Sequence, residues 1–154
     1  MKIYCIPIFL VFCAVSNSFA QTPAAYDTTT VLHLDGVAQQ TEMKDLGKYK
    51  NLRKLYLTHC NDVTDYGFLA QLTQLEILEM PHAAIADLCA LKKLKHLRRL
   101  DIRNTRIKDL APLRGLPNLA MVLCMDTAIP RQKIAAMTRR FSAKDVRIVR
   151  DYLQ

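Results

Sequence analysis

Two histidines and a glutamate are the side chains in this sequence that come nearest to forming a metal site. His59 and His82 are 23 residues apart, and Glu79 precedes His82 by three residues. Two imidazoles and a carboxylate are sufficient ligands for a catalytic-type zinc ion. These residues do not, however, form a rigid ligand motif such as H-E-x-x-H on one helix. We therefore expect neither a bound metal nor another cofactor.

The cysteines are the second group with potential chemistry. Cys60, Cys89 and Cys124 are the three that follow the N-terminal apolar segment, and an odd number leaves at least one thiol unpaired. A thiol nucleophile requires a neighbouring base in a cleft, which the spacing does not supply. The chain also lacks a Gly-rich phosphate loop, a paired-carboxylate motif and a nucleophile elbow. We expect no catalytic residues and no enzymatic activity.

The N-terminal segment has the pattern of a secretory signal peptide. Lys2 is followed by an apolar run over residues 3–15 and by the small residues Ser18 and Ala20. The run is too short to cross a membrane, which takes about 20 apolar residues. A lipoprotein signal is disfavoured because the bulky Phe12 stands where such signals require a small residue. We predict cleavage after Ala20, no remaining membrane span, and export to the periplasm or the extracellular space.

A leucine pattern returns every 22 residues in the remainder of the chain. Residues 96–117 repeat the spacing of residues 74–95, and a copy at residues 51–73 has one extra residue. A further copy begins at Leu119, and a degenerate first copy contains Leu32 and Leu34. Each Leu-x-Leu pair has the period of two expected of a strand. The residues predicted to point into the core are Leu55 and Leu57, Leu78 and Met80, Leu100 and Ile102, and Val122 and Cys124.

The pattern L-x-x-L-x-L-x-x-(N/C/T)-x-I resembles that of the leucine-rich-repeat family, in its short 22-residue bacterial form. The copy that contains Cys60 is similar to the cysteine-containing repeats of F-box adaptor proteins. The resemblance covers roughly residues 28–138. It implies an α/β leucine-rich-repeat solenoid, in which a short, curved parallel sheet is backed by helical or 3-10 return segments. It also implies that partners dock on the concave face of that sheet.

The second half of each repeat is predicted to return as a short helical turn. Asp65, Asp87 and Asp109 occupy equivalent positions just before these turns. A carboxylate there can accept hydrogen bonds from free backbone N–H groups, so we assign these residues a structural role rather than a catalytic or metal-binding one.

The two ends of a solenoid need covers, because a terminal repeat has no neighbour on one side. Pro130 stands in the favoured first turn of a predicted helix, and Ile134, Met137 and Phe141 recur on one face of it. We interpret this basic amphipathic helix as a cap in preference to a membrane-surface element. The predicted divisions are a signal peptide at 1–20, an N-terminal extension with the degenerate repeat at 21–50, repeats at 51–138 and a C-terminal cap at 139–154.

Strand positions that alternate with the core leucines are predicted to face outward from the sheet. They form columns across neighbouring rows about 4.8 Å apart. We expect these residues to bind a protein partner, and the alternative is that they are a solvated surface. The predicted partner-binding residues are His33, Tyr56, Thr58, His59, Glu79, His82, Asp101, Arg103, Leu123 and Met125.

Basic residues cluster at the corners between return segments and strands. The net charge is +8, and residues 92–98 contain Lys92, Lys93, Lys95 and Arg98. Such a charge favours acidic partners. The alternatives to a protein-binding module are therefore an envelope-associated protein that holds a lipid or glycan polyanion along this basic edge, and a purely structural repeat protein. Nucleic acid is not expected, because few aromatic residues interleave with the basic ones for base stacking.

Overall fold

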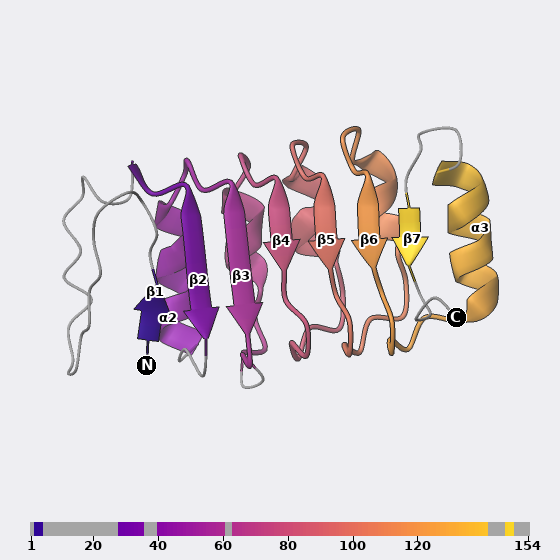
Figure 1. Cartoon of the computed structure of the whole chain (residues 1–154), viewed down its shortest axis with the longest axis horizontal. Helices are drawn as coiled ribbons and strands as arrows, with labels where there is room; N and C mark the ends of the chain where they lie inside the picture. Colours follow the sequence, from indigo (N-terminus) through magenta and orange to yellow (C-terminus); the bar gives the residue numbers. More distant parts are fainter. Residues whose placement is uncertain (1, 5–27, 36–39, 61–62, 142–146, 150–154) are drawn as a thin grey trace.

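The computed structural model describes residues 2–4, 28–35, 40–60, 63–141 and 147–149. In this part of the chain, seven strands form one sheet in sequence order (Figure 1). Strands β2 to β7 are parallel, whereas β1 pairs with β2 in the antiparallel direction. The strands are β1 (Lys2–Tyr4), β2 (Val31–Asp35), β3 (Lys54–Thr58), β4 (Ile77–Glu79), β5 (Arg99–Asp101), β6 (Met121–Leu123) and β7 (Arg147–Val149).

The register of the sheet follows the repeat period. Leu78 lies opposite Leu100, and Leu100 lies opposite Val122, so equivalent residues of successive repeats are direct neighbours. A shift of one residue would move each apolar set to the solvent side, so burial specifies this register strongly. The predicted solenoid with a parallel sheet is confirmed.

The return segments are short helices that lie behind the strands in Figure 1. The first is an α-helix, α2 (Gln40–Asp45), continued by the 3-10 helix η1 (Leu46–Lys48). The next three are the 3-10 helices η2 (Gly67–Gln71), η3 (Cys89–Lys93) and η4 (Ala111–Gly115). A 22-residue unit leaves room for little more than one helical turn, which the tighter 3-10 hydrogen bonds can close.

The three repeated aspartates take the predicted structural role. The Oδ1 atom of Asp65 accepts a hydrogen bond from the backbone N–H of Gly67 at 2.8 Å. Asp87 does the same for Cys89 at 2.7 Å, and Asp109 for Ala111 at 3.0 Å. Each carboxylate therefore satisfies a free N–H at the beginning of its 3-10 helix.

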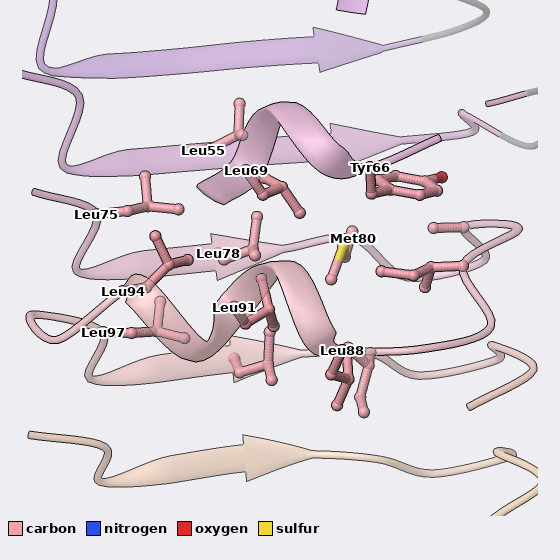
Figure 2. Close-up of a cluster of buried hydrophobic side chains, with 14 of the residues drawn as sticks. Leu55, Tyr66, Leu69, Leu75, Leu78, Met80, Leu88, Leu91, Leu94 and Leu97 are labelled. Atoms are coloured by element: carbon pink, nitrogen blue, oxygen red, sulfur yellow. The ribbon is translucent and has the colours of Figure 1, made fainter. Parts of the chain in front are cut away.

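The core is a continuous stack of aliphatic side chains between the sheet and the return segments (Figure 2). The inward strand residues predicted from the repeat are all fully buried. Cys60 and Cys124 are both buried in this core, whereas Cys89 is an exposed free thiol at the beginning of η3.

The C-terminal end of the solenoid is covered by the helix α3 (Arg131–Phe141), which begins directly after Pro130, in agreement with the helix predicted there. Ile134 and Met137 are buried and join the core, as expected for a cap. The ammonium of Lys133 lies 3.4 Å from the Asp109 carboxylate, so α3 is also tied to the last return segment. Beyond α3, β7 pairs with β6 in the parallel direction.

The predicted signal peptide lies mostly outside the described residues, of which it contains only β1. Ile3 of β1 lies opposite Leu34 of β2. Cleavage after Ala20 stays a prediction, and it would remove β1 from the edge of the sheet. The helices in the described ranges are all too short or too polar to span a bilayer.

Candidate functional site

The predicted outward columns are present on the side of the sheet away from the return segments. His33, Tyr56, Glu79, Asp101 and Leu123 lie opposite one another in successive strands. We call this surface the sheet face, and it consists of the outward residues of β2 to β6 with the outward residues among the three that follow each strand. The described residues assigned to it include all ten predicted partner-binding residues.

An aromatic pair forms the N-terminal end of the sheet face. The rings of His33 and Tyr56 stack with centroids 4.2 Å apart and planes 9° apart. Both side chains are half-buried. Beside them, the Thr58 hydroxyl donates a hydrogen bond to the backbone carbonyl of Leu34 at 3.3 Å. This end therefore presents two stacked aromatic rings beside a hydroxyl group.

A column of left-handed residues follows the strands. His59, His82, Asn104 and Asp126 have φ values of 55°, 61°, 55° and 54°, and their side chains are exposed. Histidine, asparagine and aspartate are among the non-glycine residues that tolerate this conformation best. The backbone still forms hydrogen bonds between successive repeats at this position. The N–H of His82 donates to the carbonyl of Arg103, and the N–H of Asn104 donates to that of Met125, both at 2.9 Å.

This column was not predicted as a backbone feature, although the sequence contains a signal for it. The same repeat position is occupied in turn by His, His, Asn and Asp. Those residue types share a tolerance of positive φ, which matters more at this position than their potential as ligands. In the part of the chain described, no three or more His, Cys, Asp or Glu side chains are placed to hold a metal ion.

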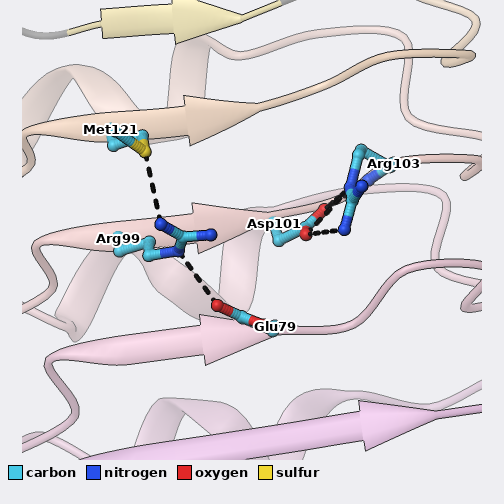
Figure 3. A network of polar contacts seen from close by, with 5 residues as sticks. All are labelled: Glu79, Arg99, Asp101, Arg103 and Met121. Atoms are coloured by element: carbon cyan, nitrogen blue, oxygen red, sulfur yellow. Dashed lines mark hydrogen bonds and ion pairs between the residues drawn. The ribbon is translucent and has the colours of Figure 1, made fainter.

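Two ion pairs occupy the centre of the sheet face (Figure 3). The Nε of Arg99 lies 2.9 Å from Glu79 Oε1, and its Nη1 lies 3.6 Å from the sulfur of Met121. Asp101 accepts hydrogen bonds from Nε of Arg103 at 2.9 Å, and Nη2 of Arg103 lies 2.7 Å from Asp101 Oδ2.

Asp101 differs from its prediction as an exposed binding residue. Its column position is as predicted, but its side chain is 0% exposed. Residues two apart in a strand share one face, so the guanidinium of Arg103 folds back over the carboxylate. Asp101 therefore supports Arg103, and Arg103 is the member of the pair that reaches the surface.

Met125 differs in the same way. It is only 7% exposed, whereas Met121 and Leu123 are half-buried. The sheet continues past β6, because Cys124 N–H donates to Val149 O at 2.9 Å. Of these three apolar residues, only Met121 and Leu123 are therefore partly exposed on the sheet face. An aspartate at position 125 would place a charge in a buried site and destabilise the fold, contrary to a purely surface role.

A parallel sheet in 22-residue register, backed by capped 3-10 turns, defines the chain as a leucine-rich-repeat solenoid. Its repeats are of the short type, with Cys60 in the one copy that carries an extra residue. No protein-family model matches the sequence.

Two curated relatives support this assignment. The chain is 29% identical over 126 residues to "Leucine-rich repeat and WD repeat-containing protein 1" of Xenopus laevis, and equally so to that of Xenopus tropicalis. The match covers 77% of this chain but only 17% and 18% of the two relatives. The likeness therefore extends to one part of those longer proteins.

Solved bacterial structures have the same fold. Internalin C2 of Listeria monocytogenes superposes with a TM-score of 0.57 at 27% identity, over 70% of this chain and 46% of its own. A leucine-rich-repeat protein of Leptospira interrogans gives a TM-score of 0.62 at 20% identity, over 78% of this chain and 29% of its own. The second likeness, at its low identity, concerns the fold alone.

Proposed function

We propose that the protein is a binding module without catalytic activity, and that its sheet face contacts a protein partner. The observation that carries this proposal is the His33–Tyr56 stack beside the exposed column that contains His59 and His82. Aromatic side chains offer a large contact area at low entropic cost and are enriched at interface hot spots. The return segments leave this face open, since they lie on the other side of the sheet (Figure 1).

The charges at the centre of the face support a protein partner over a polyanion. Glu79 is paired with Arg99, and Asp101 is paired with Arg103. Internally compensated pairs contribute little long-range attraction, so recognition there depends on shape, on hydrogen bonds and on the aromatic end. The leucine-rich-repeat relatives are consistent with this role, because such solenoids are typically non-enzymatic binding proteins.

Affinity capture with matched variants tests the proposal. The wild type, Tyr56→Ala and Lys92→Ala are each used to capture proteins from envelope and secreted fractions. Tyr56 is half-buried and Lys92 is exposed on η3, so both variants are expected to fold. The proposal requires a captured protein that is lost with Tyr56→Ala and retained with Lys92→Ala. A capture profile that is the same for all three proteins would contradict it.

Export is the second part of the proposal, and the apolar run before Ser18 and Ala20 supports it. Export would place the sheet face in contact with envelope or extracellular proteins. Fractionation of expressing cells and mass spectrometry of the N-terminus provide the test. A mature chain that begins at Gln21 in the exported fraction is the expected result. A chain that remains uncleaved in the cytosol would contradict export but not binding through the sheet face.

A further inference from the structure

A polar hollow lies at the corner where strands β4, β5 and β6 begin, at their upper ends in Figure 1. Its volume is about 350 Å³, and it is open to solvent on one side. The residues that line it are Glu76, His96, Arg98, Asn118 and Ala120. None of them belongs to the sheet face.

The hollow exists because one repeat has a short side chain at a stacked position. Glu76, Arg98 and Ala120 follow one another in the ladder, since Arg98 N–H donates to Glu76 O and Ala120 N–H donates to Arg98 O, both at 2.8 Å. The same position one repeat earlier is Arg53, whose carbonyl accepts from Glu76 N–H at 2.7 Å. Ala120 offers only a methyl group where its neighbours have long side chains, and the space beside Arg98 stays open.

Some of the polar side chains around the hollow have hydrogen-bond or ion-pair partners among the described residues, and others do not. The Glu76 carboxylate lies 3.4 Å from Nη1 of Arg53, so its charge is compensated. The amide nitrogen of Asn118 donates to the carbonyl of Lys95 at 2.9 Å, which leaves its carbonyl oxygen as an acceptor. Among the described residues, the side chains of Arg98 and His96 have no hydrogen-bond or ion-pair partner. The hollow thus combines an unpaired guanidinium with two acceptors.

The surroundings make this corner strongly positive. Lys92, Lys93 and Lys95 are exposed on the segment that leads into the hollow, and Lys95 Nζ donates to the Gly115 carbonyl at 2.9 Å. An unpaired arginine within such a group binds carboxylates in a bidentate manner. The field of the neighbouring lysines would raise the local concentration of an anionic ligand.

We propose that this hollow binds one unit of an acidic glycan, with the sugar carboxylate on Arg98 and sugar hydroxyls donating to Glu76 and Asn118. A carboxylate-bearing sugar is the ligand class that offers an anion and several hydroxyl donors on one small ring. A phosphate-rich lipid surface fits less well, because Glu76 would face it and the lining has no large apolar side chain to insert. Nucleic acid fits less well because the lining has no aromatic ring for base stacking.

Calorimetric titration with an oligogalacturonate tests the proposal, with a neutral oligosaccharide of equal length as the comparison ligand. Arg98→Gln removes the anchoring charge, and Ala120→Leu fills the hollow from an exposed position. Arg106→Gln is the matched control, since it removes the same charge from an exposed arginine in the loop after β5, beyond the other end of the strand. We expect about tenfold weaker binding for Arg98→Gln, as for loss of one charge-assisted hydrogen bond, and less than threefold for the control. Ala120→Leu should also weaken binding by about tenfold, because the leucine side chain would occupy the space of the sugar ring.

Three results would overturn the proposal. The first is binding of the oligogalacturonate that all three variants retain, or that Arg106→Gln weakens as much as Arg98→Gln. The second is equal affinity for the neutral oligosaccharide. The third is absence of oligogalacturonate binding to the wild type. If Arg98-dependent binding to vesicles of phosphatidylglycerol in phosphatidylcholine accompanies this absence, the corner is assigned to a lipid surface instead. None of these results concerns the sheet face, so the proposed protein binding would be unaffected.

Discussion

The pair formed by Asp101 and Arg103 allows a sharp test of how the sheet face is built. In Arg103→Leu, the carboxylate of Asp101 would stay in a fully buried position without its contacts to the Arg103 side chain at 2.7 and 2.9 Å. Among the described residues, its remaining hydrogen bond would be the one from the backbone N–H of residue 103, at 3.1 Å. We expect the fold to lose stability for this reason rather than through lost apolar packing.

The magnitude follows from the burial of the two partners. Removing one partner of a fully buried ion pair costs about 3–5 kcal/mol, and a single hydrogen bond to a charged group contributes about 1.5–3 kcal/mol. The carboxylate is 0% exposed but the Arg103 side chain is 34% exposed, so water can partly replace the guanidinium. We therefore expect a loss of about 2–3 kcal/mol in the free energy of unfolding. For a urea slope of about 2 kcal/mol/M, the midpoint falls by about 1–1.5 M.

Urea unfolding followed by circular dichroism measures this loss. Arg106→Leu is the matched control, because Arg106 is exposed and its removal should change the free energy by less than about 0.5 kcal/mol. The double variant Asp101→Asn with Arg103→Leu should recover part of the loss, since it leaves no unpaired charge. If Arg103→Leu is as stable as the control, water reaches Asp101 freely. The carboxylate would then be available to a partner, as the column pattern alone had predicted.

Three further predictions concern the core and two titrating groups. Leu100→Ala, at a fully buried position in the middle row, should lower the free energy of unfolding by about 2–5 kcal/mol in the same urea assay. Burial, with the nearby Cys60, raises the pKa of Tyr66 to about 12. Its contribution to stability is therefore complete below pH 10 and is lost as the pH rises toward 12. Absorbance titration should show a late-ionising tyrosine fraction that is smaller in Tyr66→Phe. The backbone N–H of Ala111, with Lys133, lowers the pKa of Asp109. Its contribution is present above the ordinary carboxyl range and lost at lower pH, so the small stability difference between the wild type and Asp109→Ala should vanish in acid.

Each of these predictions has a clear contrary result. A loss below about 1 kcal/mol for Leu100→Ala would mean that neighbouring rows do not depend on one another for burial. Ionisation of every tyrosine near pH 10 would place Tyr66 in contact with water. A difference for Asp109→Ala that persists unchanged in acid would show that the carboxylate charge is not what stabilises η4.

Much of the fold was predictable because the same pattern of apolar and polar residues recurs in every repeat. Leu78, Leu100 and Val122 occupy the same position of successive units, so a single alternation of apolar and polar residues determines both the strand direction and the register. The capping role of Asp65, Asp87 and Asp109 was predictable for the same reason. Periodicity indicates on which side of the backbone a side chain lies. The register and the capping positions depend only on this placement.

Periodicity does not indicate whether other side chains cover an outward residue. The wrong predictions of exposure on the sheet face have this cause. Asp101 and Met125 are on the predicted columns, yet both are buried. For Asp101 the cause is a neighbour two residues away whose long side chain bends back, which depends on rotamers rather than on spacing. The hollow beside Arg98 was also out of reach, because it is created by the small size of Ala120 one repeat later.

The two proposed surfaces differ in a way that makes them separable in one experiment. At the centre of the sheet face, the charges are compensated by ion pairs with distances of 2.7 and 2.9 Å. Such pairs have a weak external field, so salt has little effect on ligand binding there. In the part of the chain that the structure describes, the corner around Arg98 has lysines without an ion-pair partner and an unpaired guanidinium, so attraction there is long-ranged. Raising the ionic strength shortens the Debye length to a few ångströms at 1 M salt, which suppresses the second kind of attraction and spares the first. A ligand released by moderate salt therefore belongs to the corner, and one that withstands it belongs to the sheet face.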